Sequence, residues 1–331
     1  MLSASEFEGN LEGSTDVALA PVRGTDNRRS LPKSLFERRP LLFVQKTVFA
    51  WGLIALASSA ISFFPHWYVV IPAILVNGLI GAHLVELQHE CLHGHAFRSA
   101  AWNRWFGAIC GLFMMSSHFH YRYDHLRHHA YLGTEKNLEH FNYRFSNLDS
   151  VLGFVRAFFD LGRFKRVFGI AWRGLTGAPV PGIDKENYAK AVKEEYVLYV
   201  AILLASVIYT VVTRSWFFAL AWWIPALLIS EGVHFLIEMP EHFGLNTQSD
   251  PNVLTNCRTI RTSKIVQWFV NGNDVHTAHH YHHGVPMCNV RELNKLIEPQ
   301  LAIVERSYHA FYWDVICGRI KHNMDVSYMK R

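Results

Sequence analysis

Histidine is the residue whose spacing in this chain points most directly to chemistry. Three short segments, residues 89–93 (HECLH), 125–129 (HLRHH) and 276–280 (HTAHH), place imidazoles three or four residues apart. Such offsets bring side chains onto one face of a helix, and imidazole is the commonest protein ligand for transition metals. Eight ligands exceed the four that one zinc ion usually takes, so the sequence predicts a site for two metal ions. The eight are His89, His93, His125, His128, His129, His276, His279 and His280.

The first cluster also has a second interpretation. It spells HExxH, the motif in which two histidines bind zinc and the glutamate acts as the base of a protease. In this chain these residues are His89, Glu90 and His93, and the other two clusters are then left unexplained. The residues alone therefore leave three classes open: a two-metal enzyme, a zinc intramembrane protease, and a membrane protein that binds metal without catalysis.

The composition of the chain indicates a lipid environment. Half of the 331 residues are hydrophobic and only 18% are charged, which is low for a soluble protein. The formal net charge is +5, and Lys and Arg do not form a basic stripe with interleaved aromatic residues, which argues against nucleic acid as a partner. The five cysteines are scattered and contain no CxxC pair, so we expect reduced thiols.

Four apolar segments, in two closely spaced pairs, are long enough to cross a bilayer as helices. They span residues 47–64, 68–88, 196–212 and 216–237. The first connection holds no Lys or Arg and the second only Arg214, whereas the rest of the chain carries many. Because positive residues favour the cytoplasmic side, the pattern predicts two hairpins with both termini and all three histidine clusters in the cytoplasm.

The remaining sequence adds little further organisation. Residues 1–32 are polar and lack an apolar period, so we expect a disordered tail, and without a signal-peptide core the first apolar segment should be an uncleaved anchor. Residues 33–331 should form a single membrane domain. The predicted fold is an all-α integral membrane protein whose four spanning helices form two hairpins beneath a cytoplasmic helical cap that holds the metal site.

Two further motifs complete a pattern: Glu241-His242-Phe243-Gly244 after the fourth apolar segment, and residues 279–286 (HHYHHGVP). With the three clusters, they make residues 40–300 resemble the membrane-bound histidine-box di-iron family, which includes fatty acid desaturases, alkane hydroxylases, and carotenoid hydroxylases and ketolases. In desaturases of this family a ninth histidine after the last span also binds iron, and His242 fits that place. The resemblance thus implies nine ligands: His89, His93, His125, His128, His129, His242, His276, His279 and His280.

The same resemblance implies two Fe²⁺ ions as cofactor, O₂ as co-substrate and a lipid or acyl substrate. HxxHH in both later clusters favours desaturation of an alkyl chain, with hydroxylation or ketolation of a lipid or carotenoid as the alternative. The chain carries no dinucleotide fingerprint and no heme or iron–sulfur segment. Electrons should therefore come from a separate donor, a ferredoxin or cytochrome-type protein with its reductase.

Two positions depart from the family pattern without removing a ligand. Glu90 stands where an aspartate is usual, and His283 stands where a proline is often found, next to His282. Carboxylates close to the clusters could orient the ligating rings by accepting their second N–H, although helix caps or surface charges would look the same. These candidates are Glu90, Asp124, Glu238, Glu241 and Asp274.

Other residues near the clusters have two open interpretations each. Five histidines break the ligand spacing, and we expect supporting roles for them: His95, His118, His120, His140 and His234. Gly78, Gly81 and the aromatic residues from Trp216 to Trp223 could line an alkyl tunnel or simply pack between helices. Arg258, Arg261 and Lys264 could contact an acyl carrier's phosphates or an acidic redox partner, or be ordinary cytoplasmic charges.

Overall fold

The structure is a computed structural model that describes residues 31–137, 148 and 150–322. The predicted disordered tail at 1–32 therefore lies almost wholly outside the described residues. In chain order the elements are η1 (Lys33–Phe36), α2 (Pro40–Phe63), α3 (Trp67–Leu92), α4 (Ala100–Leu112), α5 (His118–Tyr131), α6 (Val151–Phe158), α7 (Leu161–Thr176), α8 (Glu186–Thr213), the π-helical segments η3 (Ala219–Trp223) and η4 (Ala226–Ser230), α9 (Glu231–His242), α10 (Val253–Asn256), β1 (Thr259–Ile260), α11 (Lys264–Phe269), α12 (His276–Tyr281), η5 (Met287–Asn289), α13 (Val290–Ile297), η6 (Glu298–Gln300), β2 (Val304–Glu305) and α14 (Tyr308–Ile316).

Each predicted apolar segment corresponds, to within a few residues at its ends, to a helix that is long and apolar enough to cross a membrane. The four are α2, α3, α8 and the continuous stretch Ala219–His242, which comprises η3, η4 and α9. The helices run beyond the apolar segments at several ends. For example, α8 begins at Glu186, before the predicted segment 196–212. Its first turns carry exposed charged residues such as Lys190 and Glu194, which form helix but do not appear in a search for apolar segments. The mainly helical prediction is confirmed, with β1 and β2 as a two-residue parallel pair.

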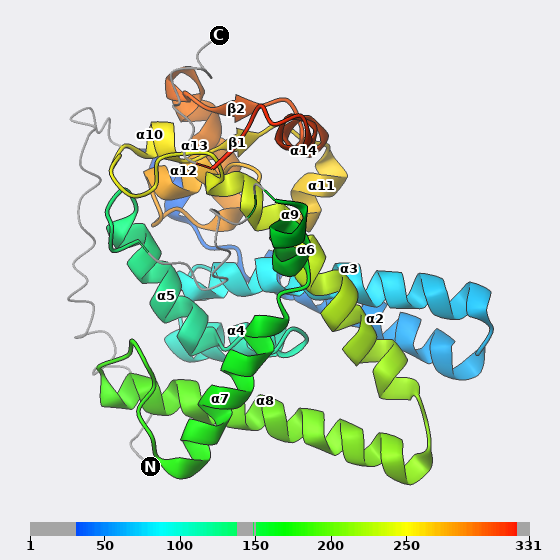
Figure 1. The fold of residues 1–331 in the computed structure, drawn as a ribbon. Helices are drawn as coiled ribbons and strands as arrows, with labels where there is room; N and C mark the ends of the chain where they lie inside the picture. The colour runs from blue at the N-terminus through cyan, green and yellow to red at the C-terminus, as the bar shows by residue number, and fades with distance from the viewer. Residues whose placement is uncertain (1–30, 138–147, 149, 323–331) are drawn as a thin grey trace.

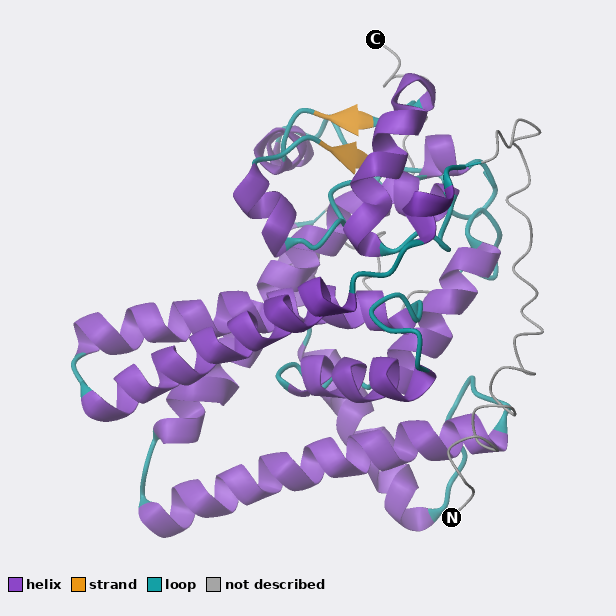
Figure 2. Ribbon diagram, turned by 180° about the vertical axis from the view of Figure 1, so that it is seen from behind, coloured by secondary structure: helices purple, strands orange, loops and turns teal. Residues whose placement is uncertain are grey.

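Helix α3 is the centre of the fold, and α2 lies beside it along its length (Figure 1). The side chain of Asn77 on α3 donates a hydrogen bond to the carbonyl of Ala221 in η3, at 2.9 Å. The fourth span meets α8 near their connection, where Trp223 Nε1 lies 3.1 Å from Ser206 Oγ. Farther on the two helices diverge, as both views show (Figures 1 and 2), and α8 packs instead against α5 and α7.

Two glycines allow α3 and the fourth span to approach closely. A Cβ atom at Gly78 would collide with Ile229, and one at Gly81 would collide with Phe113 and Ser230. Ser230 Oγ also donates to the Gly78 carbonyl, at 2.7 Å. The space beside these glycines is thus filled by neighbouring side chains, which supports helix packing rather than a tunnel wall at these two positions.

The segment after α9 folds back over the ends of α3, α5 and α9 that carry histidines (Figure 1). Arg258, next to β1, is buried there. Its guanidinium donates to the carbonyls of Pro240 and Phe243, faces Glu305 at 3.4 Å and lies 4.8 Å from the Phe311 ring. Neither a contact of Arg258 with phosphates or a redox partner nor an ordinary surface charge fits this position, because the guanidinium is buried and its partners lie inside the protein.

We expect Arg258→Ala to lower the free energy of unfolding by about 3 kcal/mol, since the change strands buried carbonyls and a carboxylate. Arg261→Ala is the matched control, because the Arg261 side chain is 70% exposed and the change should stay within about 0.5 kcal/mol. Thermal unfolding in detergent measures both. Equal effects of the two substitutions would contradict this role of Arg258.

Candidate metal centre

Four elements bring the nine predicted histidines together at one end of the helices. Helix α3 and the residue that caps its C-terminus supply the first pair, α5 the next three, the end of α9 a single residue, and α12 the last three. In that order they are His89 and His93, then His125, His128 and His129, then His242, and finally His276, His279 and His280.

Two glycines with positive φ and a helix cap lie in or next to the segments that carry these histidines. Gly94, with φ +69°, follows His93 directly and ends α3, and its N–H donates to the Cys91 carbonyl. Ser117 caps the start of α5, where its hydroxyl accepts from the His120 N–H at 3.1 Å. Gly272, with φ +105°, turns the chain just before α12. Each cluster is therefore held on a helical turn whose neighbouring backbone is fixed.

The nine histidines form two adjacent groups. The first consists of His89, His93, His125, His129 and His279, and the second of His128, His242, His276 and His280. Within each group one ring nitrogen of every member lies within 4.8 Å of those of the others. The two groups touch through stacked rings of His129 and His280, whose centroids are 4.2 Å apart.

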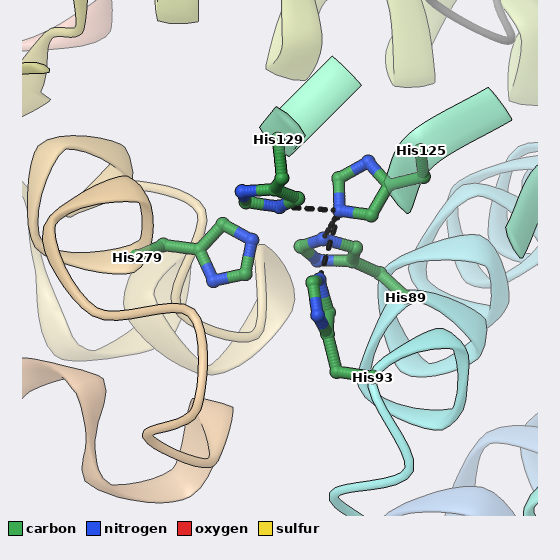
Figure 3. Close-up of side chains that lie close together, drawn as sticks. All are labelled: His89, His93, His125, His129 and His279. Carbon is green, nitrogen blue, oxygen red and sulfur yellow. Dashed lines mark hydrogen bonds between the residues drawn. The ribbon is translucent and has the colours of Figure 1, made fainter. Parts of the chain in front are cut away.

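The nitrogens of the first group converge in a way that hydrogen bonding cannot satisfy (Figure 3). His125 Nε2 lies 2.8 Å from His89 Nε2 and 2.9 Å from the Nε2 atoms of both His93 and His129. A ring nitrogen carries either one proton or one lone pair, so His125 Nε2 cannot form three such bonds at once. A cation bound by the lone pairs removes this conflict. The donor set therefore fits a metal ion.

The electrostatics of the groups agree with metal binding. Burial, followed by the neighbouring imidazoles, lowers the pKa of His125, His129 and His279 well below the usual range. Burial lowers the pKa of His128 to about 4. Both ring nitrogens of His279 lack a hydrogen-bond partner among the described residues. These rings are thus neutral at physiological pH, with lone pairs available for a ligand.

Two rings of the second group are oriented by hydrogen bonds at their other nitrogen. His128 Nδ1 lies 2.8 Å from the side-chain oxygen of Asn137, and His242 Nδ1 lies 2.9 Å from the Asn256 carbonyl. An acceptor at Nδ1 keeps the proton there and leaves the lone pair on Nε2. The sequence analysis missed both partners, because an isolated asparagine or a backbone carbonyl carries no recognisable spacing.

Comparison with known proteins identifies the chain. A model of the family described as fatty acid desaturase matches residues 65–312. The chain belongs to the fatty acid desaturase family. No curated protein sequence matches it significantly. The family implies an oxidoreductase with a lipid substrate in a membrane, which agrees with the four apolar helices and confirms the resemblance found in the sequence.

In this desaturase-family chain, one of the five candidate carboxylates contacts a member of the histidine groups. Glu241 Oε2 lies 3.4 Å from His276 Nε2, the nitrogen that also faces His242 Nε2 at 3.1 Å. Glu241 therefore lies on the side where the nitrogens gather, not behind the ring as we expected.

The other four carboxylates contact residues outside the two groups. The contacts are Glu90 with Asn271 at 3.2 Å, Asp124 with His120 at 3.5 Å, Asp274 with Arg291, and Glu238 with Tyr121 at 3.1 Å and His234 at 3.2 Å. The Glu90 contact and the family membership both disfavour the zinc-protease interpretation of residues 89–93, in which this glutamate would act as a base at the metal.

Three of the remaining histidines also have defined surroundings. The ring of His95 stacks on His93 with centroids 5.1 Å apart, and the His283 ring lies 5.3 Å from that of His129. The departure from the family pattern at position 283 thus adds an imidazole beside the first group. On α3, His83 Nδ1 lies 2.6 Å from the Phe269 carbonyl. His140 lies outside the described residues.

A groove lies between α2 and α11. It has a volume of about 560 Å³ and is lined mainly by apolar atoms, among them those of Phe49 and Trp268, with Lys46 and Lys264 also contributing. Lys46 Nζ donates to Asn271 Oδ1 at 2.7 Å, and Asn271 in turn donates to Glu90, which adjoins His89. Two hydrogen bonds therefore lead from the groove to Glu90, the neighbour of His89 in the sequence.

Proposed function

We propose that the nine histidines bind two iron ions and that the chain uses O₂ to desaturate the alkyl chain of a fatty acyl or lipid substrate. The observation that carries this proposal is the pair of buried histidine groups, five and four residues in size, with converging neutral nitrogens. Membership of the fatty acid desaturase family supports the same reaction class. The first group would hold one ion and the second the other.

The chain's own residues would prepare the site for this chemistry. Bound iron supplies the electron transfer to O₂ that no side chain can perform. The contacts of Asn137 with His128 and of the Asn256 carbonyl with His242 would direct the Nε2 lone pairs inward. Burial of most of the nine rings would keep bulk water from a reactive centre.

The stoichiometry of desaturation determines how many electrons and protons must reach the site. Formation of one double bond removes two hydrogens from the alkyl chain, and reduction of O₂ to two waters then needs two electrons and two protons more. No dinucleotide fingerprint or CxxC-type iron–sulfur segment is present in the sequence. We therefore assign the electrons to a separate ferredoxin or cytochrome-type donor with its reductase.

The orientation in the membrane follows from charge. Lys and Arg are sparse in the connections within each pair of apolar helices and frequent elsewhere. We propose two hairpins in a single domain over residues 33–331, with both termini, the helical cap and the metal centre on the cytoplasmic side. A soluble cytoplasmic donor could then reach the centre directly.

The groove between α2 and α11 is the proposed place of approach for the lipid. Its apolar lining suits an alkyl chain, and the ammonium groups of Lys46 and Lys264 suit an anionic head group. The first of these lysines lies on a membrane-spanning helix, so a lipid could enter from the bilayer. The substrate class that this favours is an acyl lipid with a phosphate or carboxylate head group.

Iron analysis tests the ligand assignment. Protein purified under anaerobic conditions should contain about two iron ions per chain, whereas His129→Ala and His276→Ala, one in each group, should hold about one or fewer and form no product. His309→Ala is the control, because that histidine is exposed and lies outside both groups. Full iron content in both ligand variants, or an active zinc-loaded protein, would refute the assignment.

Product analysis separates the two reactions of the family. Lipids of a host that expresses the chain should gain double bonds that are absent with the His129→Ala variant. Under ¹⁸O₂ the new product should carry no label, because both oxygen atoms leave as water. Incorporation of ¹⁸O into the lipid would favour hydroxylation or ketolation instead.

Charge reversal at the groove tests the approach of the lipid. Lys264→Glu should raise KM about tenfold for a substrate with an anionic head group in neutral vesicles, with kcat unchanged, because it replaces attraction by repulsion. Lys295→Glu, an exposed lysine on α13, is the matched control. An equal rise in the control, or the same rise for a neutral head group, would count against this site.

A further inference from the structure

A buried polar network connects the second and fourth spans outside the two histidine groups. At its centre is His234 of α9, which is 1% exposed. Its Nδ1 lies 3.1 Å from Glu86 Oε1 on α3, and its Nε2 lies 3.2 Å from Glu238 Oε1 on its own helix. The ring therefore bridges the buried carboxylate of Glu86 and the largely shielded carboxylate of Glu238 through both nitrogens, an arrangement that suits an imidazolium ion.

Each carboxylate has a further partner on another segment. The Asn273 side chain, in the turn before α12, donates to Glu86 Oε2. The Tyr121 hydroxyl, on α5, donates to Glu238 Oε1 at 3.1 Å. All five side chains are largely shielded from solvent, so water cannot replace these partners at low cost.

Each of the four partners around His234 lies three or four residues before one of the gathered histidines. Glu86 precedes His89 by three residues and Asn273 precedes His276 by three, while Tyr121 precedes His125 by four and Glu238 precedes His242 by four. In α3, α5 and α9 these offsets place both residues on one face, about one turn apart, whereas Asn273 lies in the turn before α12. Each of the four segments that carry members of the histidine groups, taken with the turn before α12, thus contributes to the network close to a histidine.

We propose that the network centred on His234 is a positioning device for the metal centre, which fixes the four histidine-bearing segments relative to one another. This inference rests on the proposed function, since it takes the two groups as metal ligands. Apolar contacts tolerate small shifts between helices, whereas hydrogen bonds between buried polar groups fix distance and direction. His234 would act through the ligands and would not itself bind a metal.

The fourth span offers a matched control three residues away. Glu231 is also buried and forms an ion pair with Arg163 of α7. Helix α7 carries none of the nine histidines. Loss of either polar group should lower the stability of the fold, but only loss of His234 should disturb the geometry of the metal centre.

The test measures metal binding by folded, metal-free protein. His234→Gln should weaken binding of Fe²⁺ by 10- to 100-fold, about the range expected when a residue that orients ligands is changed. Tyr121→Phe, which removes a single hydroxyl, should weaken it about fivefold. Glu231→Gln should lower the unfolding temperature yet leave the Fe²⁺ affinity of the folded fraction unchanged.

A second readout follows the ligand geometry itself. The visible absorption bands of the Co²⁺-loaded protein should shift in His234→Gln and Tyr121→Phe and remain as in wild type in Glu231→Gln. Wild-type Fe²⁺ affinity and Co²⁺ bands in His234→Gln would overturn the positioning role and leave the ligand assignment intact. Equal loss of affinity in Glu231→Gln would show a general effect of stability and overturn it too. A wild-type protein that binds no Fe²⁺ would overturn the proposed function together with this inference.

Discussion

The convergence of nine uncharged imidazoles in a space with little access to water is the constraint on which the rest of the structure depends. Rings such as His125 and His279 are buried, and that burial depresses their pKa values. Each neutral ring has only one N–H, which cannot satisfy several converging nitrogens, so their approach is unfavourable unless a cation binds the lone pairs. The surrounding fold must therefore hold the rings together in the absence of the metal as well as in its presence.

Four chain segments that are distant in sequence meet this constraint by different means. Helix α3 ends at Leu92, directly before His93, and Gly94 then turns the chain away. Helix α5 is capped at Ser117 and carries its grouped histidines in its second half, and Gly272 reverses the chain before α12. The second and fourth spans approach closely at Gly78 and Gly81, which brings the ends of α3 and α9 together. Helix termini and close crossings, more than loops, thus determine where the histidines lie.

Eight of the nine positions could be predicted from the sequence alone, because helical offsets such as those at residues 125–129 are a local property that periodicity reveals. His242 stands alone in its segment and became recognisable only through the family resemblance. The spans were predictable because the apolar runs are long, but their ends were not, since turns such as those around Lys190 continue a helix without apolar residues. Arg258 illustrates the remaining limit: its charge suggested a surface contact, and only tertiary structure shows the carbonyls that surround it.

The buried acids show how the fold keeps the imidazole nitrogens available. A carboxylate that accepted a hydrogen bond from Nε2 of a ligating ring would hold a proton where the lone pair is needed. Glu86 and Glu238 instead contact His234, and Glu90 contacts Asn271. Each of these carboxylates lies within about one helical turn of a grouped histidine, yet it contacts another residue rather than the ring nitrogens of the two groups. Glu241 is the exception, since it faces the same space as His276 Nε2. Negative charge is thereby placed close to a centre whose nitrogen ligands carry none, which would offset part of the charge of two bound cations.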